Sequence, residues 1–219
     1  MNKFTTSEAL SYGWKKTKEQ FWLIAGVLVA YSAISIVISS IEKSNTVKEN
    51  IVLAIVLFII SITVGTILKI GLMKFFLNAN EGKGQFADLF SAHGTFFTYF
   101  IGSTALGIIT IVGILLLIVP GIIFAMMYFF TLFLIVDRKM EIIDAFKESA
   151  AMTKGSRWDL FGFVAVAGLI NILGAIALVI GLLVTVPITA FATIYVYKAL
   201  LNAEIPMTTA TPIEPASTM

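Results

Sequence analysis

Five residues in the second half of the chain have the chemistry to bind a phosphate group. Lys154 and Arg157 are cations, Trp158 follows directly, and Arg138 and Lys139 precede them across a short polar segment. Guanidinium and ammonium groups hydrogen-bond phosphate oxygens, and Trp prefers the headgroup level of a bilayer. We therefore predict that these residues contact the headgroup of an anionic lipid. The alternative is a solvated cluster that only sets the orientation of the chain in the membrane.

Asn171 is the most polar residue deep within an apolar segment. Its amide is suited to a hydrogen bond between two helices, and equally to contact with a solute or the wall of a pore. No ionisable residue lies near the middle of any apolar segment. This absence argues against transport coupled to ions or protons.

Small residues recur at helical spacing within the apolar segments. Serines form a stripe at positions 32, 35 and 39, and small residues four apart occur as Ser61–Gly65, Ser103–Gly107 and Ala177–Gly181. Such spacing lets helix backbones approach closely in a membrane. We predict that these faces pack against other helices.

No residue pattern predicts an enzyme. The chain has no Cys and one His, His93, and it contains no nucleophile motif, HExxH sequence or phosphate-binding loop. We accordingly expect no catalytic residue, no metal and no cofactor. The formal net charge of +2, spread over dispersed basic residues, also argues against a nucleic-acid partner.

The composition places these residues in a membrane protein. Hydrophobic residues make up 58% of the 219 residues and charged residues 13%, about half the charged share of a soluble domain. About 20 apolar helical residues cross the hydrocarbon core of a bilayer. We therefore predict an all-α polytopic transmembrane helical bundle of three hairpins, with six spans at about 22–41, 51–77, 96–118, 121–136, 159–180 and 182–200. Tight turns between successive spans are expected at Pro120–Gly121 and near Gly181, with the last span starting before Pro187.

Two amphipathic helices are predicted at the membrane interface. The first covers residues 6–20 and the second covers residues 140–154. One face of the first helix carries Leu10, Trp14, Thr17 and Phe21, and one face of the second carries Ile143, Phe146, Ala150 and Thr153. We expect a single transmembrane domain over residues 1–202 and a disordered tail, rich in Pro, Thr and Ser, over residues 203–219.

The basic residues predict the orientation of the spans. With six spans, only Lys43 and Lys48 fall on the side of the first hairpin turn. The other 13 lie on the side of the N-terminus, at positions 3, 15, 16, 18, 69, 74, 83, 138, 139, 147, 154, 157 and 198. Because cytoplasmic segments carry the excess of Lys and Arg, both termini are expected in the cytoplasm.

A weak internal repeat connects the two amphipathic segments. Residues 8–22 align with residues 144–158 at an offset of 136, with Ala, Thr, Lys and Trp identical in the fifteen aligned pairs. Each aligned segment leads into a predicted hairpin, and residues 86–93 resemble a shorter third copy. We predict three units, each an interfacial helix followed by a hairpin; parallel repeats of this kind occur in transporters and in other membrane proteins.

The longest distinctive stretch is at residues 119–155, VPGIIFAMMYFFTLFLIVDRKMEIIDAFKESAAMTKG. It resembles a group of six-span prokaryotic membrane proteins that share a Pro-Gly-Ile turn, an aromatic span ending in Asp, and an amphipathic Asp-Ala…Ser…Lys-Gly helix. That group is similar to the membrane domain attached to some glycerophosphoryl diester phosphodiesterases, and the opening EALSYGWKKTKEQFW fits it too. The resemblance implies this fold and a prokaryotic cell membrane. It does not carry the phosphodiesterase activity, because these residues include no additional soluble domain.

These observations favour a non-enzymatic membrane scaffold or accessory subunit. The expected partners are the lipid bilayer, an anionic lipid, and a membrane protein or a second copy of this chain. A transporter or channel for a neutral or lipid-like solute is the alternative, based on the repeat, the Pro-interrupted hairpins and Asn171. A lipid-modifying enzyme is a third hypothesis, and it would require His93, Asp137 or Asp144.

Overall fold

The computed structural model describes residues 3–42, 51–92, 94–116 and 118–208, which are helical with no strand among them. The elements are α1 (Thr6–Glu19), α2 (Phe21–Glu42), α4 (Ile51–Asn80), the 3-10 helix η1 (Phe86–Phe90), α5 (Phe96–Leu116), α6 (Ile118–Met127), α7 (Thr131–Arg138), α8 (Ile142–Met152), α9 (Arg157–Ile176) and α10 (Leu178–Thr208). Six helical segments are long and apolar enough to cross a membrane. The predicted all-α fold with six membrane-spanning segments is confirmed.

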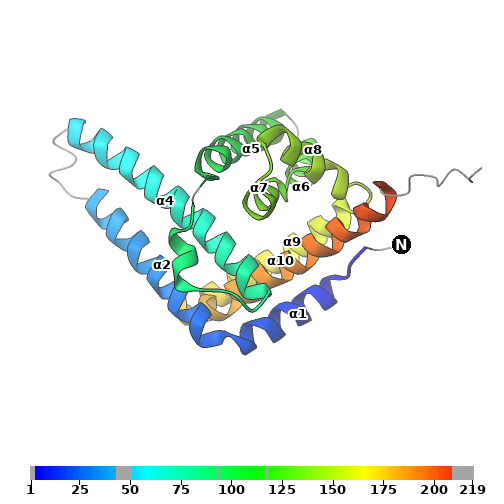
Figure 1. Cartoon of the computed structure of the whole chain (residues 1–219), viewed down its shortest axis with the longest axis horizontal. Coiled ribbons are helices and arrows are strands. Elements are labelled where there is room, and N and C mark those ends of the chain that lie inside the picture. Colours follow the sequence, from blue (N-terminus) through cyan, green and yellow to red (C-terminus); the bar gives the residue numbers. More distant parts are fainter. Residues whose placement is uncertain (1–2, 43–50, 93, 117, 209–219) are drawn as a thin grey trace, which may run out of the picture.

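The helices follow one another as three similar units. In each unit a short helix, which we call the leading helix, precedes a hairpin of longer apolar helices. The leading helices are α1, η1 and α8, and their hairpins are α2–α4, α5 with α6–α7, and α9–α10. The α2–α4 hairpin projects to the upper left of Figure 1, away from the α9–α10 hairpin, so the hairpins are not parallel to one another. The contacts that join them are therefore concentrated near the leading helices.

Each leading helix lies against the last helix of another unit, and together these contacts close a ring. Helix η1 packs on α4, α8 packs on α7, and α1 packs along α10. Two of these contacts bring backbones together at a glycine: a Cβ atom at Gly71 would collide with the Leu89 carbonyl, and one at Gly13 with the Ile188 carbonyl. Only a residue without a side chain permits such an approach.

The structure supports the repeat that joins the first and last leading helices. Equivalent residues, 136 positions apart, are buried in both: Ala9 with Ala145, Gly13 with Ser149, and Thr17 with Thr153. In each helix the Thr hydroxyl donates a 2.8 Å hydrogen bond to the backbone carbonyl four residues earlier. The equivalence therefore extends from sequence to burial and hydrogen bonding.

The apolar faces expected for the first and last leading helices are packed within the chain only in part: Thr17 and Thr153 are buried, and Leu10 packs against the core. Trp14 is 47% exposed and Ile143 is 68% exposed. The hydrophobic pattern picks out the bulky apolar residues of an amphipathic helix. The fully buried positions are mostly small residues, which allow neighbouring backbones to approach, whereas Trp14 and Ile143 lie on the surface of the chain.

The fourth span is interrupted, which also differs from the prediction. A continuous helix was expected over residues 121–136, but α6 ends at Met127 and α7 begins at Thr131. The Ser149 hydroxyl accepts a hydrogen bond from the Phe130 amide at 3.2 Å and donates one to the Met127 carbonyl at 3.0 Å. The Thr153 hydroxyl donates to the same carbonyl at 3.2 Å. Side chains of α8 thus satisfy backbone groups that the break leaves without helical partners.

Other boundaries differ from the predictions by a few residues. Helix α5 ends at Leu116 and α6 begins at Ile118, so Pro120 lies in the first turn of α6, where its missing amide costs no hydrogen bond. The α9–α10 boundary falls at Ala177 rather than Gly181, and α10 continues through Pro187 to Thr208, beyond the predicted start of the tail at residue 203. Residues 209–219, Lys43, Lys48 and His93 lie outside the described residues.

We predict that Ser149→Ala destabilises the bundle. The substitution leaves the buried Phe130 amide without an acceptor, which costs about 1–3 kcal/mol. Thermal unfolding of the purified protein in detergent measures the effect. Ser103→Ala is the matched control, because that hydroxyl only bonds a carbonyl of its own helix on an exposed face. Equal melting temperatures for the two variants would contradict the role of Ser149.

Candidate functional site: a basic and aromatic cleft beside α6

The connection between α8 and α9 brings three of the predicted site residues together. Helix α8 ends at Met152, and Gly155 takes the left-handed conformation with φ of 83°. Glycine adopts this conformation without steric cost, so the chain reverses sharply and α9 begins at Arg157. Lys154, Arg157 and Trp158 therefore surround one turn.

These residues line a cleft whose other wall is α6. The cleft has a volume of about 260 Å³ and is lined by Ile122, Ile123 and Met126 of α6 and by Lys154, Gly155, Arg157, Trp158 and Phe161. This volume lies just under the 300–1,000 Å³ typical of small-molecule sites. The cleft is therefore sized for part of a larger amphipathic ligand, with cations at one end and an apolar wall beside them.

The cations of the cleft have no partner in the part of the chain that the structure describes. Arg157 Nε is buried without a hydrogen-bond acceptor, and neither Arg157 nor Lys154 forms an ion pair with another described residue. An arginine side chain stays charged in proteins, and a buried donor without an acceptor is costly. The site is consequently electropositive and suited to an anion.

Arg138 and Lys139, which are predicted to assist the other three residues in headgroup contact, do not line this cleft. Arg138 ends α7, and Lys139 follows it with a φ of 52°. Helix α8 then runs back along α7, and its 11 residues separate its two ends by about 16 Å. The pair Arg138 and Lys139 therefore lies at one end of α8, and the pair Lys154 and Arg157 at the other. Their closeness in sequence did not indicate this separation.

Asn171 forms the expected bond between helices. Its Nδ2 donates to Thr189 Oγ1 on α10 at 3.0 Å. Its Oδ1 atom is buried and has no partner among the described residues. Both groups line a cavity of about 350 Å³ that also contacts Gly168 and Thr193. The structure thus shows the structural role of Asn171 and leaves one acceptor beside a cavity.

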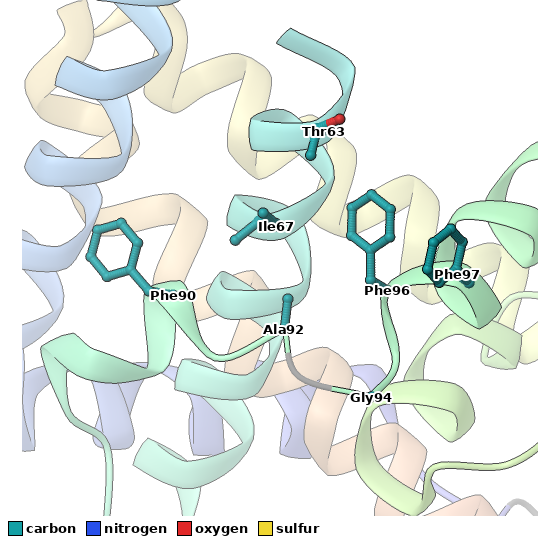
Figure 2. Close-up of a pocket in the computed structure, with 7 residues that line it drawn as sticks. All are labelled: Thr63, Ile67, Phe90, Ala92, Gly94, Phe96 and Phe97. Atoms are coloured by element: carbon teal, nitrogen blue, oxygen red, sulfur yellow. The ribbon is translucent and has the colours of Figure 1, made fainter. Parts of the chain in front are cut away.

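A second cleft, of about 510 Å³, was not predicted from the sequence. It is lined by Thr63, Ile67, Phe90, Ala92, Gly94, Phe96 and Phe97. Figure 2 shows Phe96 and Phe97 on one side of Ile67 and Phe90 on the other. Like the basic cleft, it lies where a leading helix turns into its hairpin. The sequence contained an indication of this cleft, because Gly94 is followed by a hydroxyl residue and two large residues, as Gly155 is.

The ends of α4 and α10 carry a polar network that the sequence analysis also missed. Asn78 donates to Asp88 at 2.9 Å, Lys74 donates to the Ser91 hydroxyl at 2.8 Å, and Lys198 pairs with Glu81 at 3.2 Å. The pattern Lys-x-x-Leu-Asn-Ala occurs at residues 74–79 and again at residues 198–203. This second repeat could have indicated that the last helices of two units are equivalent.

Comparisons with protein-family models, with curated proteins and with solved structures found no match to this chain. The resemblance to the membrane domain of glycerophosphoryl diester phosphodiesterases therefore stays a prediction. Among the described residues, no group of three or more His, Asp or Glu side chains is placed to hold a metal ion. The function is therefore inferred from the geometry of the clefts and helix faces.

Lys198 lowers the pKa of Glu81 below its ordinary value of 4.5, first by a hydrogen bond and then by its charge, with Lys83 a smaller cause. We predict that Lys198→Met raises this pKa toward 4.5, and that Lys83→Met raises it less. Because the folded pKa is depressed, the contact stabilises the fold fully above pH 4.5 and is lost as the pH falls below the folded pKa. An NMR titration of the Glu81 carboxyl in lipid nanodiscs measures both variants. A larger shift in Lys83→Met would contradict the assignment.

Proposed function

We propose that this protein is a non-enzymatic membrane scaffold or accessory subunit that packs against helices of other membrane proteins. The observation that carries the proposal is the open space beside small residues of α4 and α5. Apart from the adjacent backbone of its own helix, a Cβ atom at Gly65 or Gly107 would meet no atom of the described residues within 4 Å. By contrast, one at Gly181 would collide with Gly174 across the α9–α10 hairpin. Two of the small-residue pairs are thus not used by the described part of the chain.

Open small-residue faces in a membrane favour a helical partner over lipid. Lipid tails cover bulky apolar side chains as well as a helix does. The gap beside a glycine, which we call a notch, is filled best by the backbone of a closely packed helix. The serine stripe on α2 supports the same view, because Ser32 and Ser39 are exposed on an otherwise apolar helix. The most apolar window of α4 has only 11% of its residues buried within the chain. The α2–α4 hairpin and α5 therefore offer the proposed partner surface.

The proposal includes a location and an orientation. We place the chain as a multi-pass protein in the cell membrane of a prokaryote, with both termini in the cytoplasm. The orientation is based on the excess of 13 basic residues on one side over two on the other. One residue that the lipid-modifying enzyme hypothesis requires takes part in helix packing. Asp137 accepts a 2.9 Å hydrogen bond from the buried Tyr197 hydroxyl, which is a packing contact between α7 and α10.

We predict that Gly65→Leu combined with Gly107→Leu abolishes copurification of the partner. The added side chains fill the notches that a partner helix would enter, while the open space leaves the fold of this chain intact. The measurement is affinity purification from native membranes in lipid particles, followed by mass spectrometry. Gly65→Ala with Gly107→Ala is the matched control and should retain the partner. If the wild-type protein itself reproducibly copurifies with no protein, including a second copy, the scaffold function is wrong.

A transporter or channel for a neutral or lipid-like solute is the second candidate, favoured by the acceptor of Asn171 beside its cavity. If this candidate is correct, Asn171→Leu should reduce solute flux in proteoliposomes about tenfold or more, because the loss of one hydrogen bond to a solute costs about 1.4 kcal/mol. Thr63→Val, which removes a hydroxyl from a different cleft, is the control. Flux that Asn171→Leu leaves unchanged removes Asn171 from the pathway. No flux of any solute in a broad panel removes the candidate.

A further inference from the structure

The three hairpins begin with an exposed aromatic side chain at equivalent positions. The second residue of each first hairpin helix is the exposed one: Trp22 of α2 is 85% exposed, Phe97 of α5 is 76% exposed, and Trp158 of α9 is 68% exposed. Trp22 and Trp158 are related by the same offset of 136 residues as the leading helices. Trp side chains prefer the level of lipid headgroups, and Phe97 occupies the equivalent position in the second unit. The turn between each leading helix and its hairpin is consequently expected at this level.

Two of these turns have the same geometry and form clefts of the same kind. Gly94 and Gly155 both adopt the left-handed conformation, with φ of 78° and 83°. Each turn faces an apolar helix of the preceding unit, α4 in the cleft of Figure 2 and α6 in the basic cleft. The clefts differ in charge, because the residue two positions after the glycine is Phe96 in one and Arg157 in the other. The charge is therefore a property of one cleft and not of the architecture.

We propose that the basic cleft binds the phosphate group of an anionic membrane lipid. Arg157 and Lys154 contact the phosphate, and Trp158 lies at the headgroup level beside it. An acyl chain of the lipid packs along α6 over Ile122, Ile123 and Met126. The guanidinium of Arg157, which has no acceptor among the described residues, gains one from the phosphate. The cleft thus supplies both the charge and the apolar wall that such a lipid requires.

The apolar wall is what favours a lipid over a soluble phosphate. The residues that continue from the cleft along α9 are themselves apolar and exposed, with Phe161 at 37% and Leu169 at 60%. A soluble phosphate contacts only the cations, whereas a lipid that places its phosphate there also packs an acyl chain against Ile123 and this surface. The inference goes beyond the scaffold function and does not depend on it, since the lipid would bind to a chain that has no protein partner.

The test measures lipid binding to the purified full-length protein by native mass spectrometry, with phosphatidylglycerol and phosphatidylcholine as probes. We expect the wild-type protein to prefer phosphatidylglycerol, and Lys154→Gln with Arg157→Gln to weaken that binding about tenfold or more, because two charge-assisted hydrogen bonds are lost. The matched control is Arg138→Gln with Lys139→Gln, which removes the same charge away from the cleft and should bind like wild type. An equal loss in both double variants would overturn the proposal, because it would show attraction by overall charge.

A third variant keeps the test independent of Arg157 and of its effect on folding. Ile123→Trp fills the cleft without a change of charge, and it should also weaken phosphatidylglycerol binding about tenfold. Unchanged binding in Ile123→Trp would overturn the placement of the lipid. Glycerol phosphate and inorganic phosphate are added as competitors. Displacement of the lipid at millimolar concentrations of either would show that the cleft takes a soluble anion, and equal binding of the two lipids would show that it does not select for charge; either result overturns the proposal.

Discussion

Close approach of helix backbones at the leading helices is the constraint on which the rest of the bundle depends. A membrane provides little hydrophobic drive between apolar helices, so packing and hydrogen bonds must hold them together. Here Gly13 lets α1 contact the backbone of α10, and Gly71 lets η1 contact α4. The side chain of α8 that takes the place of Gly13 is Ser149, whose hydroxyl bonds directly to the backbone at the α6–α7 break. The contact of α1 with α10 joins the first and last helices and closes the ring.

The interruption of the fourth span follows from this arrangement. Helix α8 approaches α6 and α7 so closely that Ser149 and Thr153 reach the Met127 carbonyl. Backbone groups freed by a break within a membrane need partners from the protein, because lipid supplies none. The hydroxyls meet that need, and the break in turn gives α8 backbone groups to bind. The same contact fixes where α8 ends, and therefore where the basic cleft opens between α6 and α9.

The proposed functions lie on parts of the molecule that this internal packing does not use. Gly65 and Gly107 face open space, although the same kind of residue is packed against a helix at Gly181. Arg157 Nε is buried without an acceptor among the described residues, whereas other polar side chains, such as Tyr12, Gln20 and Asn78, are hydrogen-bonded within the chain. Small-residue notches favour a partner helix, and an unpaired guanidinium favours an anion. The two surfaces are on different helices, so a protein partner and a lipid would not compete.

Length and hydropathy act locally along each segment, and they were enough to predict six apolar segments in three hairpins. The sequence also indicated that residues 8–22 and 144–158 are equivalent, and it singled out Lys154, Arg157, Trp158 and Asn171. Helix packing set the rest: which helix faces are buried, the separation of α6 from α7, and the position of Arg138 and Lys139 outside the cleft. Each of these features depends on how closely two helix backbones approach and on which polar groups then lack a hydrogen-bond partner. Both depend on residues that are far apart in sequence. Hydropathy does not predict these contacts, because a glycine packed against a backbone and a glycine that faces open space have the same hydropathy.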